Sequence, residues 1–116
     1  MDCIFCRIIS GEIPSQIVYE NETVLAFNDI SPAAPVHILI VPKKHLASVD
    51  DITINDKDIS AAMFEAAGEI AKLKNLSGDG YRLIINNGSA AGQEVLHLHM
   101  HILGGKKKLG PMLSKQ

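Results

Sequence analysis

The stretch Gln93-Glu94-Val95-Leu96-His97-Leu98-His99-Met100-His101-Ile102-Leu103 places three of the chain's five histidines at every second position, with aliphatic residues between them. Successive side chains of a β-strand point to opposite faces, so this period of two predicts a strand with the imidazoles on one face. Neighbouring imidazoles would lie roughly 7 Å apart, so one small anion could touch two or three of them. The Gly104-Gly105 pair that follows favours a strand that ends there.

A cluster of imidazoles has a defined chemical repertoire. Histidine titrates near pH 6.5, so a cluster can hold neutral and protonated members together at neutral pH. A neutral imidazole is a nucleophile, and a protonated one is an acid and an anion ligand. This combination suits attack on a phosphoryl group whose charged oxygens are stabilised by neighbouring donors. The alternatives are a metal site and a half-buried polar face, and the stretch alone does not separate them from catalysis.

Length, composition and charge narrow the class of protein. The 116 residues fit one domain, 1–116, and an apolar fraction of 47% allows a packed core. No apolar run approaches the ~20 residues that span a membrane, and the start lacks a secretion signal, so we expect a cytoplasmic protein without a membrane partner. The formal charge is −2 and the concentrated basic run is Lys106-Lys107-Lys108, which argues against a polynucleotide partner.

The two cysteines form a Cys3-Ile4-Phe5-Cys6 motif at the start of the chain. A redox motif needs a preceding strand, for which two residues leave no room. A metal site needs two further ligands, for which His45 and His97 are candidates, and Cys2His2 is a standard closed zinc set. Two reduced thiols beside a packed N-terminal turn are the alternative interpretation.

Other candidate residues lie along the predicted elements. Asp29 could accept two hydrogen bonds from a ribose diol, or could cap a turn before Pro32. His37 could be a site residue or an ordinary sheet residue. We expect strands over Ile17–Glu20, Thr23–Phe27, Val36–Val41, Tyr81–Asn86 and the histidine stretch, and a long amphipathic helix over about Asp56–Leu76.

These residues stand in blocks that resemble the histidine triad (HIT) superfamily, whose motif is His-φ-His-φ-His-φ-φ with φ apolar. The resemblance covers nearly the whole chain. In detail, the sequence is most similar to the Hint branch, the purine nucleoside phosphoramidases. The blocks are Asp-Cys-Ile-Phe-Cys-Arg-Ile-Ile (2–9), Gly-Glu-Ile-Pro-Ser (11–15), Ala-Phe-Asn-Asp-Ile-Ser-Pro (26–32), His-Ile-Leu-Ile-Val-Pro-Lys-Lys-His (37–45), Asn86 to Val95, and His97 to Gly105.

The resemblance implies a fold and an activity. The fold would be α+β, a five-stranded antiparallel sheet with one long and one short helix, in homodimers that join two sheets into one. The activity would be hydrolysis of purine nucleoside 5′-phosphoramidates, releasing AMP or GMP from an amine. His99 would be the nucleophile of a nucleotidyl–histidine intermediate, with His101 at the phosphate and leaving group, and His97 and His37 holding the array.

The resemblance also implies binding residues. The ribose would be held by Asp29 and Ile30. The phosphate would be held by Asn86 and the segment Gly92, Gln93, Glu94 and Val95, whose backbone N–H groups can form an anion nest. An apolar purine pocket would be walled by Phe5, Ile8, Ile13 and Phe27, although each of these side chains could equally be core.

The resemblance further implies a structural zinc held by Cys3, Cys6, His45 and His97, since many bacterial members look like this, although other members lack the cysteines. No catalytic cofactor is expected, because a P–N bond with a protonatable nitrogen needs an acid more than a Lewis acid. Position 94 departs from the branch, where many members carry Ser. An ionised Glu94 cannot donate a hydrogen bond, so it points away from the phosphate or binds a cationic leaving amine such as lysine.

Three other functions remain open. The same fold could hydrolyse dinucleoside polyphosphates, as in the Fhit branch, although Gly104-Gly105 argues against it. The chain could be a nucleotide-binding regulatory protein in which hydrolysis is incidental. It could also store zinc through its five histidines and two cysteines.

Overall fold

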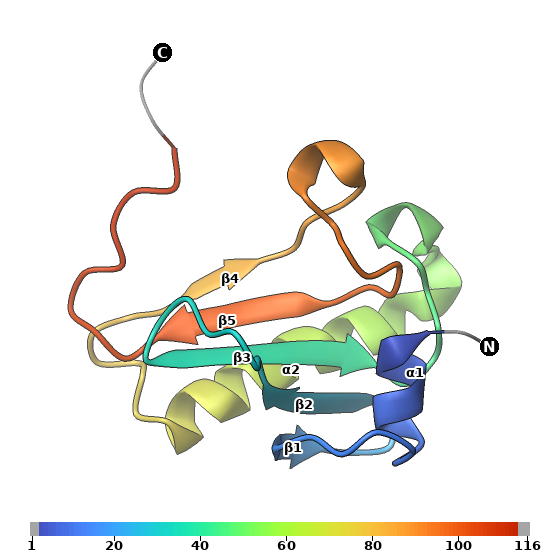
Figure 1. Cartoon of the computed structure of the whole chain (residues 1–116), viewed down its shortest axis with the longest axis horizontal. Coiled ribbons are helices and arrows are strands. Elements are labelled where there is room, and N and C mark those ends of the chain that lie inside the picture. Colours follow the sequence, from blue (N-terminus) through green and yellow to red (C-terminus); the bar gives the residue numbers. More distant parts are fainter. Residues whose placement is uncertain (1–2, 114–116) are drawn as a thin grey trace.

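The computed structural model describes residues 3–113 and consists of one antiparallel sheet with helices on both faces (Figure 1). The strands follow the order β1-β2-β3-β5-β4. The predicted five-stranded sheet with one long and one short helix is confirmed. The elements are α1 Ile4–Ile9, β1 Ile17–Glu20, β2 Val24–Asn28, β3 Val36–Pro42, η1 Val49–Asp51, η2 Ile54–Asp56, α2 Lys57–Leu73, β4 Arg82–Ile84, η3 Ser89–Ala91 and β5 Met100–Gly104.

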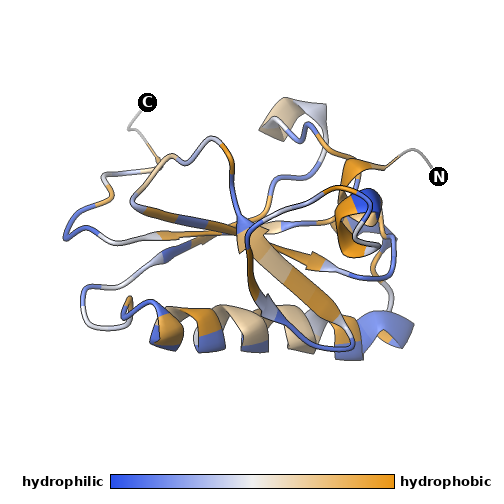
Figure 2. Ribbon diagram, turned by 60° about the horizontal axis from the view of Figure 1, so that its bottom comes forward, coloured by the Kyte–Doolittle hydropathy of each residue, from blue (hydrophilic) through white to orange (hydrophobic). Residues whose placement is uncertain are grey.

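β2 and β3 are buried on both faces, and β5 alternates buried and partly buried residues. The period of two sorts the side chains of these strands between two apolar clusters. Figure 2 shows α2 along one face of the sheet, with α1 and the η3 turn on the other. On the α2 face, Ile38 pairs with Ile102 and Ile40 with Met100, and all four side chains belong to the cluster packed under α2. On the other face, Leu39 pairs with His101, and Leu39 joins the cluster beneath α1 that includes Phe5, Ile8, Leu25, Phe27 and Val41. The histidine face is therefore the α1 face.

The strand that carries the histidines is shorter than predicted. β5 begins at Met100, so of the three histidines only His101 lies in it. Upstream the chain leaves the β3 ladder, because the N–H of Leu98 bonds the carbonyl of Leu46 at 2.6 Å instead. The alternation of faces nevertheless continues, since Leu98 packs in the α2 cluster while the rings of His97 and His99 contact Phe5 on the opposite face.

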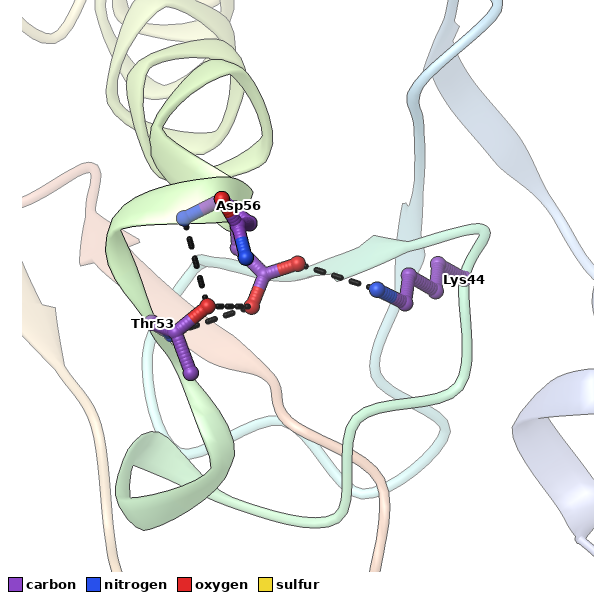
Figure 3. A network of polar contacts seen from close by, with 4 residues as sticks. Lys44, Thr53 and Asp56 are labelled. Atoms are coloured by element: carbon purple, nitrogen blue, oxygen red, sulfur yellow. Dashed lines mark hydrogen bonds and ion pairs between the residues drawn. The ribbon is translucent and has the colours of Figure 1, made fainter.

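The start of α2 is fixed by a polar network around a buried carboxylate, shown in Figure 3. Asp56 accepts hydrogen bonds from the Thr53 N–H at 3.0 Å and from Lys44 Nζ at 3.0 Å, while the Thr53 hydroxyl accepts from the Asn55 N–H. The Thr53 N–H and then Lys44 lower the pKa of Asp56. Because Lys44 precedes His45, this network also anchors the segment that carries a predicted metal ligand.

Two predictions concern the chain as a whole. None of the helices within residues 3–113 has the length and apolar character needed to span a membrane. The single domain predicted over 1–116 stays a prediction, and its residues 1–2 and 114–116 lie outside the described part of the chain.

Candidate functional site

The ring of His99 is held by a backbone carbonyl in a single tautomer. Its Nδ1 lies 2.7 Å from the carbonyl oxygen of His97, and a carbonyl can only accept, so Nδ1 carries the hydrogen. The other nitrogen, Nε2, therefore holds a lone pair. The edge-on contact of His99 with Phe5, at 5.2 Å between centroids, and its burial at 8% exposure hold the ring in place. His99 thus offers a nucleophilic nitrogen of fixed direction.

His37 and His101 are linked by a hydrogen-bond relay that fixes the other tautomer, with the hydrogen on Nε2. The N–H of Ala33 donates to His37 Nδ1 at 3.0 Å, so His37 carries its hydrogen on Nε2. That Nε2–H donates to His101 Nδ1 at 2.9 Å and lies 3.5 Å from Asp29 Oδ2. His101 must then carry its own hydrogen on Nε2. The relay makes His101 a hydrogen-bond donor, in contrast to the lone pair of His99.

The environment of His101 also keeps its ring uncharged. Burial lowers the pKa of His101 to about 4, and the neighbouring His99 and His37 act in the same direction. At neutral pH His101 is therefore a neutral donor. Its ring lies 5.1 Å from that of His99, centroid to centroid, which places donor and nucleophile against the same small volume.

A pocket of about 270 Å³ opens beside these two rings. It brings together residues from α1, the β2–β3 loop, β3, the β4–β5 loop and β5. Eight of its nine lining residues are candidates from the sequence, and the ninth, Leu39, is two positions from His37 on β3, so the period of two could have identified it. The lining residues are Phe5, Asp29, Leu39, Asn86, Gly92, Glu94, Val95, His99 and His101.

A larger pocket of about 560 Å³ shares Asp29 with this one. It is lined by Pro14, Ser15, Gln16, Asn28, Asp29 and Ile30. Ile30 is 98% exposed and therefore open to a ligand. Because Asp29 lines both pockets, a ligand can extend from the histidines past this carboxylate into the larger space.

The predicted purine wall is divided between pocket and core. Phe5 lines the histidine pocket and packs edge-on against Phe27 at 5.6 Å. Ile8 and Phe27 are buried in the cluster beneath α1, and Ile13 packs against that cluster. Of these four side chains, Phe5 has direct access to the pocket.

The loop before the histidines is braced by Gln93. Its amide donates to the carbonyls of Ala47 and Val95 at 2.8 and 3.1 Å and accepts from the Gly88 N–H at 2.8 Å. The N–H groups of Gly92 and Gln93 already bond the carbonyls of Ser89 and Gly88. An anion nest in this loop would therefore use the N–H groups of Glu94 and Val95.

The remaining predicted residues meet on the same face, in a group we call the metal-ligand cluster: Cys3, Cys6, His45 and His97. One ligand atom from each lies within 4.8 Å of all the others. His97 Nδ1 is 3.1 Å from His45 Nδ1 and 3.4 Å from Cys3 Sγ, and Cys6 Sγ is 3.3 Å from His45 Nδ1. Tetrahedral zinc with bonds of about 2.0 Å to nitrogen and 2.3 Å to sulfur spaces its ligands about 3.3–3.8 Å apart. The distances of 3.1 to 3.6 Å between His97, His45 and the two thiols are near that spacing.

The hydrogen bonding of His97 agrees with a ligand role. Its Nε2 donates to the Pro42 carbonyl at 2.8 Å, which leaves a lone pair on Nδ1 facing the cysteines. The ring is fully buried, and this burial lowers the pKa of His97. His97 does not line the histidine pocket, so the triad splits into one ring among the thiols and two at the pocket.

A second group, Asp29, His37 and His101, also brings ligand atoms close together. Here the hydrogen bonding opposes metal binding, because the Ala33 N–H occupies the lone pair of His37 and forces a hydrogen onto Nε2, between the other two residues. This group is a hydrogen-bond relay whose hydrogens have fixed positions, and not a metal site.

Comparison with known proteins places these residues in context. The family described as HIT domain matches residues 10–108. The purine nucleoside phosphoramidase of Escherichia coli (strain K12) is 48% identical over 113 residues, covering 97% of this chain and 94% of that protein. A solved histidine triad protein from Clostridium difficile superposes with a TM-score of 0.92 at 54% identity, covering 98% and 97% of the two chains. A HIT family hydrolase from Clostridium thermocellum gives a TM-score of 0.92 at 48% identity, covering 97% of each chain.

Proposed function

The chain belongs to the HIT domain family, and we propose that it is a hydrolase of purine nucleoside 5′-phosphoramidates, which releases AMP or GMP from an amine. One observation carries the proposal. The bond from His99 Nδ1 to the His97 carbonyl leaves the Nε2 lone pair of His99 at a pocket that a hydrogen-bond donor, His101, also lines. The relative whose name states this activity adds support.

The first chemical step is a displacement at phosphorus. His99 Nε2 attacks the phosphorus, the P–N bond to the leaving nitrogen breaks, and that nitrogen takes up a proton and departs as the amine. The imidazole becomes a cation, whose Nδ1–H stays bonded to the His97 carbonyl. His101 donates from Nε2 to a phosphoryl oxygen or to the leaving side, where charge develops.

The second step returns the enzyme to its starting state. Water attacks the phosphorus of the nucleotidyl–His99 intermediate, its oxygen bonds to phosphorus, and the P–N bond to His99 breaks. The water loses one proton, which balances the proton that the amine took up. The net reaction therefore adds one water across the P–N bond. His37 acts throughout as a positioning residue that keeps the His101 donor pointing outward.

Nucleotide binding is proposed for the surfaces on either side of Asp29. Asp29 lines both pockets, and its carboxylate would accept hydrogen bonds from the ribose hydroxyls, with the exposed Ile30 beside it. Asn86 and the backbone of Glu94 and Val95 would hold the phosphate. Phe5 would contact the base, with Ile8, Ile13 and Phe27 supporting it from the apolar cluster.

We propose that the metal-ligand cluster holds one structural zinc ion. The four protein ligands would fill the tetrahedral coordination of zinc and leave no open position for a substrate. The role of the zinc would therefore be structural, to fasten α1 to the sheet. Cys3 is the N-cap of α1 and Cys6 lies within it, whereas His45 and His97 come from the loops that follow β3 and precede β5. Zinc would thus hold Phe5 over the pocket.

We further propose that the protein is a homodimer that joins two sheets at β4. This strand is at the edge of the sheet, and Leu83 within it and the flanking Tyr81 and Ile85 are each 37% exposed. Apolar side chains on an unpaired edge favour pairing with a second copy. Light scattering should report twice the chain mass, and Leu83→Asp should give monomers; a monomeric wild type would overturn this proposal.

The reaction is tested by trapping the intermediate. Wild type and His99→Ala are incubated with adenosine 5′-phosphoramidate, quenched, and mapped by mass spectrometry, with diadenosine triphosphate as a parallel substrate. We expect AMP release and one adenylated residue, His99, in wild type alone. Adenylation elsewhere would overturn the mechanism. Faster turnover of diadenosine triphosphate would favour the alternative function, a dinucleoside polyphosphate hydrolase.

A further inference from the structure

The charges that line the histidine pocket do not suit an anionic substrate alone. Its ionisable lining groups are two carboxyls, Asp29 and Glu94, and two imidazoles, of which His101 is neutral at neutral pH. The lining, which lies entirely within residues 3–113, includes no Lys or Arg. A phosphoramidate brings a further negative charge, so substrate binding leaves at least one carboxylate facing an anion without a cation between them.

The two carboxylates differ in what already engages them. Asp29 accepts the N–H of Ser31 at 2.7 Å and lies 3.5 Å from His37 Nε2. The side chain of Glu94 makes no hydrogen bond or ion pair with any residue in the described part of the chain. Glu94 is therefore the carboxylate that remains available to a ligand.

The loop holds Glu94 at the pocket instead of leaving it on a mobile surface. Gln93 fastens the preceding residue to Gly88 and Ala47 and also bonds the carbonyl of Val95, one residue beyond Glu94. These bonds fix the backbone on both sides of Glu94, so little backbone freedom is lost when its exposed side chain binds a ligand. The position of Glu94 is thus preorganised by its neighbours.

The relation of the two pockets assigns Glu94 to one end of the substrate. Asp29 lines both pockets, whereas Glu94 lines the histidine pocket and is not part of the larger one. If the ribose hydroxyls bind Asp29, where the two pockets meet, the other substituent on phosphorus, the amine, can lie in the histidine pocket beside Glu94.

On the basis of the proposed function, we propose that Glu94 forms a subsite for a second, positively charged nitrogen in the leaving group. The preferred substrates are then nucleoside phosphoramidates of diamines and other dibasic amines. The ammonium group neutralises Glu94 and lies between its carboxylate and the phosphoryl oxygens, which a neutral alkylamine cannot do.

The test compares two adenosine 5′-phosphoramidates whose leaving amines have the same number of heavy atoms, 1,3-diaminopropane and n-butylamine. The quantity measured is the ratio of their kcat/KM values in wild type, Glu94→Gln and Glu65→Gln. The isosteric Glu94→Gln keeps the shape and removes the charge. Glu65 is an exposed carboxylate on α2, on the opposite face of the sheet, and serves as the matched control. Taking the ratio within each protein cancels the intrinsic reactivity of the two compounds.

We expect Glu94→Gln to lower the diamine-to-alkylamine ratio about tenfold, the size of one charge-assisted hydrogen bond. Glu65→Gln should leave the ratio unchanged, and added salt should reduce it in wild type. Equal ratios in wild type and Glu94→Gln, with both compounds hydrolysed, would overturn this inference and leave the proposed function intact. Failure of all three proteins to hydrolyse either compound would overturn both.

Discussion

The metal-ligand cluster and the histidine pocket lie side by side on one face of the sheet, and each contains imidazoles from the same short segment. In the cluster, the lone pair of His97 faces His45 and two thiols. In the pocket, His99 presents a lone pair and His101 a hydrogen, because a carbonyl fixes one ring and a relay fixes the other. Identical side chains therefore acquire different chemistry from the group bonded to their second nitrogen.

The largest difference between the two regions should be in turnover. His99→Ala removes the nucleophile and should lower kcat/KM at least about 10⁴-fold. His45→Ala removes a metal ligand and should cost far less, because no atom of His45 lines the pocket. Both variants are assayed on the same phosphoramidate. An equal loss of kcat/KM in His45→Ala would contradict the assignment of catalysis to the pocket and metal binding to the cluster.

Metal content should separate the regions in the opposite direction. Zinc at a thousandfold excess over its Kd stabilises the folded state by about 4 kcal/mol. A Cys3→Ser/Cys6→Ser variant should lose both the bound zinc and this stabilisation. His37→Ala, in the pocket relay, should keep about one zinc per chain by elemental analysis. Wild type that binds no zinc from excess would contradict the assignment of the cluster.

Acid should destabilise the folded protein because His101, in the histidine pocket, is harder to protonate than in the unfolded chain. The folded-state pKa of His101, about 4, lies below the usual 6.5, so the unfolded chain takes up the proton first as the pH falls. Stability is therefore unaffected by this group above about pH 6.5 and declines as the pH drops from there to about 4. Urea unfolding across this range should show a shallower decline in His101→Gln; an identical decline would argue against a lowered pKa.

The smallest effect is expected at the side chain that touches both regions. Phe5 packs edge-on against His97 at 5.9 Å and His99 at 5.2 Å. Phe5→Leu keeps an apolar side chain but removes both ring contacts, and should cost about 1 kcal/mol of unfolding free energy. The urea midpoint measures this. No change, with unaltered KM, would show that the two regions are not joined through Phe5.

The sequence predicted much of this arrangement, and its shortfalls have physical causes. Period-two patterns placed the strands and the histidine face, because side-chain alternation is a local property. The start of β5 at Met100 could not be predicted, since it depends on the N–H of Leu98 meeting a carbonyl 52 positions earlier, at Leu46. The sequence likewise grouped Cys3, Cys6, His45 and His97, which the structure brings together.

The tautomers lay beyond sequence reasoning for a similar reason. They depend on which backbone groups reach each ring: the Pro42 carbonyl for His97 and the Ala33 N–H for His37. The sequence also suggested a single row of three imidazoles, whereas the fold turns the first of them toward the thiols. Glu94 was a candidate from the sequence and does line the pocket, but the hydrogen bonds of Gln93 that hold its loop could not be predicted.

The tautomers of the imidazoles are the most direct test of this account. Long-range ¹H–¹⁵N spectra of ¹⁵N-histidine-labelled protein at neutral pH distinguish a protonated ring nitrogen from one with a lone pair. We predict hydrogen on Nδ1 of His99 and on Nε2 of His37, His97 and His101. A spectrum that places the hydrogen of His99 on Nε2 would remove the nucleophilic lone pair and contradict the account.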